Sequence, residues 1–143
     1  MKLILKEKST YILRFDKGEE LMTELKKFCL RQKVKAGYFF GLGSASLAEL
    51  SHYDMERKKY SDLRIKQKLE IISLTGIIGS FKKDTVIHLH GLFSDKSMNV
   101  RGGHVKKLIV AATAEIILQK IAGKINRVYN PKIGLNLLLN SQT

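Results

Sequence analysis

The chain has 143 residues, the usual size of a single domain, and its composition shows no break that would divide it. Hydrophobic residues make up 44% of it, which excludes intrinsic disorder, and no apolar run approaches the length that spans a bilayer. Lysine and arginine outnumber aspartate and glutamate by 26 to 13, and this net charge of +13 predicts attraction to polyanions such as nucleic acids.

Two features of the chain favour a cytoplasmic location. The first residues, Met1-Lys-Leu-Ile-Leu-Lys, contain too few consecutive apolar side chains for a signal peptide. Cys29 is the single cysteine, so it has no partner for an intramolecular disulfide or a thiolate metal site. We therefore expect a protein of a reducing compartment that makes no membrane contact.

The N-terminal part predicts two strands followed by a helix. Apolar side chains alternate within residues 2–15, as in two short strands, and the alternation stops at Asp16-Lys17-Gly18. Residues 18–32 predict the clearest helix, because Asp16 and Glu19 resemble a capping box before an apolar stripe at helical spacing. The stripe consists of Leu21, Leu25, Phe28 and Cys29. A cysteine in such a stripe is usually a small core residue, so we expect Cys29 to be buried and unreactive.

Strand patterns dominate the rest of the chain. Residues 36–42 and 47–53 predict two strands, separated by a turn or bulge at Gly41-Leu-Gly43. That segment lacks the third glycine and the following helix of a phosphate-binding loop. Residues 55–64 predict a basic connection, and residues 65–80 a long strand whose apolar character suggests burial on both faces. Further strands are expected at residues 84–93, at 107–119, where the alanines also suit a helix, and within 127–139 after a turn at Asn130-Pro131.

The expected elements define the fold class. They amount to about seven strands and one clear helix at residues 18–32, without the strict alternation of strand and helix that builds a parallel sheet. The sequence therefore predicts an α+β fold in which residues 1–143 form a single compact domain around a largely antiparallel or mixed sheet.

Three of the four histidines lie in one short stretch. His88 and His90 are two residues apart in an expected strand, so their side chains project from the same face. His104 follows two glycines that permit close backbone approach, which could place its imidazole beside the other two. Three neutral imidazoles with an open fourth position are a familiar ligand set for zinc, and imidazole also binds nickel, copper and iron.

The histidine pattern leaves two readings open. The three imidazoles could hold a zinc ion that activates a water or polarises a carbonyl, or they could form a buried hydrogen-bonded network or a subunit interface without metal. Glu115 is the nearest acidic candidate to join a metal site, since it interrupts an apolar strand, but a salt-bridged carboxylate at the sheet edge is equally compatible with that position. No catalytic base is identified.

The basic residues form short groups spread along the whole chain. Two of these groups are candidates for contacts with nucleic acid: Arg57, Lys58 and Lys59, and then Lys82 and Lys83. The alternative is that they belong to an ordinary solvated surface.

Taken together, seven segments resemble the plants-and-prokaryotes conserved (PPC) domain family in order and spacing, from about residue 8 to residue 139. These segments are Gly18-Glu-Glu20, Gly41-Leu-Gly-Ser44, Leu69-Glu-Ile-Ile-Ser-Leu-Thr-Gly76, His88-Leu-His90, Gly102-Gly-His104, Ala112-Thr-Ala-Glu-Ile116 and Gly134-Leu-Asn-Leu-Leu138. The resemblance implies a stand-alone bacterial member of the family that forms a homotrimer. It also implies that His88, His90 and His104 are similar to the zinc site of acetolactate decarboxylases.

The resemblance also bears on DNA. Plant members carry an AT-hook before the domain, a short Arg-Gly-Arg-Pro segment that binds the minor groove, and their segment for partner contacts corresponds to Lys68-Leu-Glu-Ile-Ile-Ser73. This chain has no AT-hook, so minor-groove recognition of A·T pairs is not expected from it.

Two functions follow as hypotheses. The first is a DNA-binding protein with a regulatory role, which binds weakly and mainly through phosphates. The second is a zinc-dependent enzyme or a sensor of a small-molecule ligand, built on the three histidines. A purely structural trimer is a third possibility.

Overall fold

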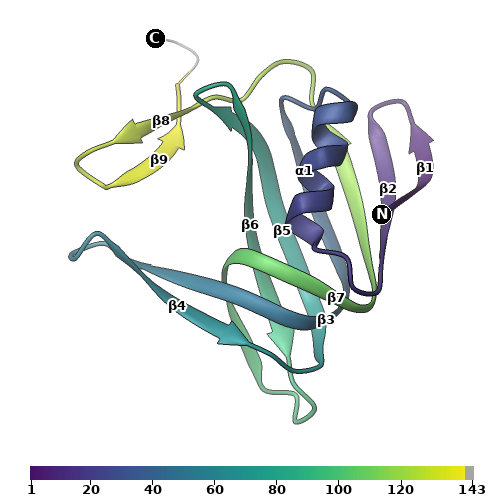
Figure 1. Cartoon of the computed structure of the whole chain (residues 1–143). Coiled ribbons are helices and arrows are strands. Elements are labelled where there is room, and N and C mark those ends of the chain that lie inside the picture. Colours follow the sequence, from purple (N-terminus) through teal and green to yellow (C-terminus); the bar gives the residue numbers. More distant parts are fainter. Residues whose placement is uncertain (141–143) are drawn as a thin grey trace.

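The computed structural model describes residues 1–140 and consists of one helix and two antiparallel sheets (Figure 1). The elements in chain order are β1 (Lys2–Glu7), β2 (Thr10–Asp16), α1 (Leu21–Arg31), β3 (Gly37–Asp54), β4 (Lys59–Ile65), β5 (Leu69–Phe81), β6 (Asp84–Ser94), β7 (Val100–Lys120), β8 (Arg127–Asn130) and β9 (Leu135–Leu138).

The larger sheet has seven strands in the order β1-β2-β7-β6-β5-β3-β4, and β3 also pairs with β7. Every pairing between its strands is antiparallel. The extra pairing joins two strands that the linear order separates, so the sheet curves back on itself. The smaller sheet is the β8–β9 hairpin. The α+β class, the single clear helix and the largely antiparallel seven-stranded sheet are therefore confirmed.

The expected break at Gly41-Leu-Gly43 is a bulge inside one continuous strand. The register of β3 shifts between Gly41 and Gly43 against β5, and Gly43 has a φ of +144°. A Cβ atom at Gly43 would lie 2.6 Å from the Cα of Ala114 on β7. Glycine is thus required where this part of β3 passes the backbone of β7. The two strands expected at 36–42 and 47–53 are one strand because the chain passes the bulge without turning.

Helix α1 starts later than expected and has a different cap. The carboxylate of Glu20 accepts hydrogen bonds from the backbone N–H groups of Met22 and Thr23. The capping box expected of Asp16 and Glu19 forms only in part. The Glu19 carboxylate accepts from the Asp16 N–H at 2.8 Å, but Asp16 ends β2 and its own carboxylate pairs with Lys2 and Arg14.

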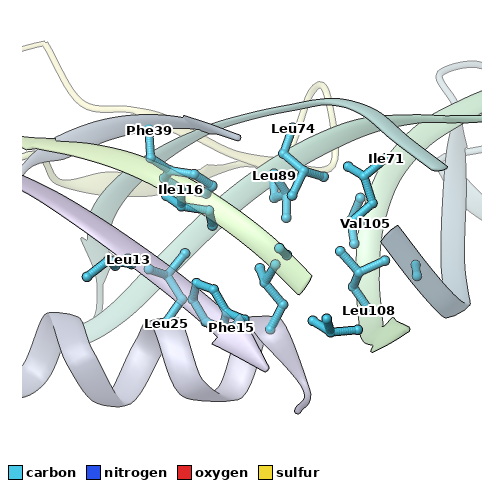
Figure 2. Close-up of a cluster of buried hydrophobic side chains, with 14 of the residues drawn as sticks. Leu13, Phe15, Leu25, Phe39, Ile71, Leu74, Leu89, Val105, Leu108 and Ile116 are labelled. Atoms are coloured by element: carbon cyan, nitrogen blue, oxygen red, sulfur yellow. The ribbon is translucent and has the colours of Figure 1, made fainter. Parts of the chain in front are cut away.

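The core lies between α1 and the inner face of the curved sheet (Figure 2). Leu25 of the helix and Leu13, Phe15, Phe39 and Ile116 of the strands are at most 1% exposed. Cys29 belongs to the same cluster, and its burial raises the pKa of its thiol to about 12. It is a core residue, as expected.

Two strand predictions need correction. Part of the connection expected at 55–64 is strand β4, which pairs along its length with the end of β3. The prediction that residues 65–80 are buried on both faces is also wrong, since burial along β5 alternates and Ile72 and Ile77 are exposed. The reason is that α1 covers only the inner face of the sheet.

The opposite face of the sheet, called the outer face below, carries seven large apolar side chains that are between 36% and 57% exposed. They are Tyr38, Phe40, Leu42, Ile72, Ile77, Leu92 and Ile117. Several are neighbours across the strands, since Tyr38 lies opposite Ile77 and Phe40 opposite Ile117. Monomeric proteins rarely expose an apolar patch of this kind, and such patches mark contact surfaces.

The helix of residues 1–140 is too short to cross a membrane.

Candidate metal centre

His88 and His90 project from the outer face of β6. Leu89 between them is fully buried, so the two histidines lie on the opposite side of the strand, as the alternation in the sequence predicts. His88 lies opposite Ile77, and His90 opposite Thr75, so both border the apolar outer face.

His104 reaches the other two histidines through a glycine-dependent pairing. Gly102 and Gly103 of β7 pair with Leu92 and Gly91 of β6, and His104 pairs directly with His90. A Cβ atom at Gly102 would lie 2.8 Å from the carbonyl oxygen of Gly91. The glycines therefore permit the close approach that the sequence suggested.

The three imidazoles form one compact cluster. One ring nitrogen of each of His88, His90 and His104 lies within 4.8 Å of the others, and the ring centroids are 5.1 to 5.4 Å apart. Zinc binds imidazole nitrogens at about 2.1 Å, so the nitrogens of a zinc site lie within about 4 Å of one another. Small side-chain rotations would bring these nitrogens to that spacing. The donor set fits a zinc ion.

Burial disfavours the charged form of two of the three imidazoles. Burial lowers the pKa of His88 from 6.5 to about 4, assisted by the Arg127 guanidinium and the other two imidazoles. Burial also lowers the pKa of His104, with further contributions from His90, Lys106 and Arg127. Neutral imidazole is the form that binds metals, so the ring nitrogens of His88 and His104 are available as ligands at neutral pH.

A cleft of about 380 Å³ opens beside His88 and His104. Its walls include Tyr60 of β4 and residues of the β8–β9 hairpin. Figure 1 shows β4 and this hairpin on the same side of the molecule. A Tyr53 hydroxyl donates to the Ile133 carbonyl at 2.7 Å and joins the β3–β4 hairpin to the β8–β9 hairpin. The cleft thus depends on the C-terminal hairpin.

Arg127 is the cation of this cleft. A terminal nitrogen of its guanidinium lies 3.2 Å from Nδ1 of His88, and its Nε is buried without a hydrogen-bond partner among residues 1–140. The other terminal nitrogen donates to the Asn136 carbonyl at 2.9 Å, and the remaining N–H groups of the two terminal nitrogens are suited to an anionic ligand in the cleft. No pattern in the sequence identifies Arg127, because it reaches His88 only when the start of β8 lies beside β5, where Asn126 bridges to Ser80.

The other predicted site residues lie elsewhere. Glu115 is exposed on β7 opposite Arg14 and is not among the residues of the histidine cluster. Arg57 and Lys58 occupy the β3–β4 turn with Lys59 beginning β4, whereas Lys82 and Lys83 form the β5–β6 turn at another end of the sheet (Figure 1). All five basic residues are exposed, but they form two separate groups.

Comparison with protein families gives one match, to the Plants and Prokaryotes Conserved (PCC) domain over residues 4–122. Among curated proteins, the chain is 34% identical over 110 residues to the bifunctional protein GlmU of Synechococcus sp. (strain JA-3-3Ab). The match covers 76% of this chain but only 16% of that protein, so the chain spans about a sixth of its curated relative.

Solved structures share the whole fold. A candidate DNA-binding protein from Bacteroides thetaiotaomicron has a TM-score of 0.91 at 27% identity, with 94% of each chain covered. A plant- and prokaryote-conserved (PPC) protein from Pyrococcus horikoshii has 0.86 at 32% identity, covering 92% of this chain and 91% of that one. The metal-containing protein AF0104 from Archaeoglobus fulgidus also has 0.86, at 26% identity, covering 98% of this chain and 100% of that one.

Acetolactate decarboxylase is related by fold alone. The enzyme from Bacillus subtilis strain 168 has a TM-score of 0.56 at 13% identity, covering 92% of this chain and 61% of that one.

The low pKa of His88 predicts an acid-sensitive metal-free protein. Below about pH 6.5 the unfolded chain protonates this imidazole, whereas the folded chain keeps it neutral until about pH 4. Above that window His88 is neutral in both states and does not lower the free energy of unfolding. As the pH falls through the window, protonation of the unfolded chain lowers that free energy. Urea unfolding of metal-free protein at about pH 7 and about pH 5 should show a lower midpoint in acid. A His88→Gln variant should lose less stability between the two, and an equal loss would contradict the assignment.

Proposed function

This chain belongs to the Plants and Prokaryotes Conserved domain family, and we propose that it is a zinc protein whose centre consists of His88, His90 and His104. The observation that carries the proposal is the convergence of three imidazoles from two strands, with one ring nitrogen of each within 4.8 Å of the others. Support comes from the metal-containing relative of Archaeoglobus fulgidus, which has the same fold over its full length.

The centre is suited to a small anionic ligand. Three imidazoles leave a zinc ion at least one open position, and the bound ion acts as a Lewis acid toward a carbonyl or carboxylate oxygen. The Arg127 guanidinium beside His88 offers a second anchor for a carboxylate, and Tyr60 forms a wall of the same cleft. We therefore propose a small carboxylate as the ligand class.

Sensing is favoured over catalysis by the charges of the cleft. No aspartate or glutamate is among the described residues that line it, so no protein carboxylate is placed to accept a proton from a bound ligand. An enzyme would have to obtain its base from the ligand or from water.

We also propose that the protein is a homotrimer associated through the outer face. The resemblance in sequence implies the trimer, and the seven exposed apolar side chains of the outer face are suited to its contacts. Phe40 lies at the middle of this face, opposite Ile117 and Thr75, and the neighbour of Thr75 is His90. A second copy would thus cover the exposed side of the metal centre.

DNA binding is the second candidate function. The net charge of +13 favours contact with phosphates, and the solved relatives from Bacteroides thetaiotaomicron and Ralstonia eutropha are candidate DNA-binding proteins. This binding would be weak and independent of base sequence. A role in regulation would therefore need a further contact that recognises a particular DNA sequence.

Removing one imidazole should abolish metal binding. Untagged protein, purified without chelators or metal-affinity resin, should contain about one zinc per chain, and His90→Ala should lose it. His52→Ala is the matched control, because His52 is exposed on β3 and lies outside the cluster. Elemental analysis measures the outcome. A parent protein that contains no metal and rejects added zinc would refute the proposal.

A charge in the middle of the outer face should dissociate the trimer. Light scattering after size exclusion should give the parent three times the chain mass of 16.2 kDa and Phe40→Lys a single chain mass. Phe40 is 51% exposed, so the substitution should leave the fold intact. Leu30→Lys, at a 58% exposed position of α1, should remain trimeric. A monomeric parent protein would exclude this assembly.

Binding to duplex DNA should depend steeply on salt. Each phosphate contact adds about 0.9 to the slope of log affinity against log salt, so several contacts lower affinity by at least ~10-fold between about 50 and 200 mM salt. Fluorescence anisotropy with two unrelated duplexes measures both the slope and the base preference. Salt-independent affinity, or a strong preference between the duplexes, would contradict binding through phosphates.

A further inference from the structure

Four lysines from three separate connections line one cleft of about 310 Å³. Lys33 and Lys35 follow α1, Lys83 lies in the β5–β6 turn, and Lys124 lies between β7 and β8. Figure 1 shows that these three connections meet at the end of the sheet where β5 turns into β6. We call this feature the lysine cleft.

The charge of the lysine cleft is not balanced by the protein. No aspartate or glutamate is among its lining residues, and none of its four lysines forms an ion pair within the part of the chain that the structure describes. By contrast, Lys2, Lys27 and Lys106 elsewhere each bind a carboxylate. Uncompensated cations held in one place attract a polyanion from solution.

Backbone hydrogen bonds fix the three connections to one another. The N–H of Ser80 donates to the carbonyl of Ile125 at 2.8 Å, and the N–H of Ile125 donates to the carbonyl of Lys35 at 3.3 Å. Lys33 and Lys83 have φ angles of 50° and 74°, typical of tight turns. The backbone of the four lysines is therefore held together, although their side chains stay exposed.

The chemistry of the lysine cleft indicates its ligand. It contains no arginine fork that would grip a single phosphate in two places. Exposed lysines act instead as point charges along a chain of phosphates, which is how proteins bind nucleic acid without reading its sequence. We propose that the lysine cleft is where the phosphate backbone of a nucleic acid contacts this protein, a proposal that rests on the second candidate function.

The other basic group is less suited to this role. The Arg57 guanidinium lies 3.8 Å from the Asp54 carboxylate, and the Lys58 ammonium donates to the Pro131 carbonyl at 3.1 Å. The β3–β4 turn that carries them lies far from the β5–β6 turn in Figure 1. Part of its charge is thus already engaged within the protein.

Two matched triple variants test the location. The first, Lys35→Gln with Lys83→Asn and Lys124→Gln, removes three charges from the lysine cleft. The second, Arg57→Gln with Lys58→Asn and Lys59→Gln, removes three charges from the β3–β4 turn and the first residue of β4. Each has asparagine at its one lysine with positive φ, because asparagine tolerates that conformation.

Binding of a fluorescent mixed-sequence duplex is measured by anisotropy across a range of salt. The lysine-cleft variant should bind at least ~10-fold more weakly than the parent, with a salt slope lower by about 2 to 3, whereas the control variant should change little. Equal weakening by both variants would overturn the location and leave DNA binding standing. A parent that binds no duplex at low salt would overturn both. The same variants are also tested with vesicles of anionic lipid, and a lysine-cleft variant that loses binding to the vesicles but not to the duplex would refute the proposal.

Discussion

The antiparallel pairing of β3 with β7 joins the two longest strands of the protein, from Gly37 opposite Lys120 to Ser51 opposite His104. β3 also pairs with β4 and β5, and β7 also pairs with β2 and β6. This contact therefore curves the sheet, closes the space that α1 fills and brings the start of β7 beside β6. Gly43 permits it, since a side chain there would collide with the backbone of β7.

The same curvature divides the sheet into two functional faces. The inner face holds the core, and the outer face holds exposed apolar side chains next to His88 and His90. In the proposed trimer, the apolar residues and the metal centre would form one continuous region, so that assembly and ligand binding would influence each other. A ligand that binds at the centre could then stabilise the assembled form.

The two cation sites differ in what they could bind. Arg127 is partly buried and touches the histidine cluster, so its guanidinium is directed at a small ligand in the cleft. The lysines of the lysine cleft are exposed and unpaired, which suits an extended polyanion. Because the two sites use different elements, a protein of this family could bind a metal-held carboxylate and a nucleic acid at once.

The local sequence determined the α1 stripe, the buried Cys29, the alternation that aligns His88 with His90, and the glycines that admit His104, because each depends on periodicity or on near neighbours. The β4 strand and the true helix cap depend on local hydrogen bonds that the residue pattern did not reveal. The exposure of one face of β5 and the position of Arg127 were decided only by tertiary structure, because they depend on contacts between distant segments. Apolar strands have the same composition whether a helix or another subunit covers them. The partners of a basic residue such as Arg127 can be identified only from the folded structure.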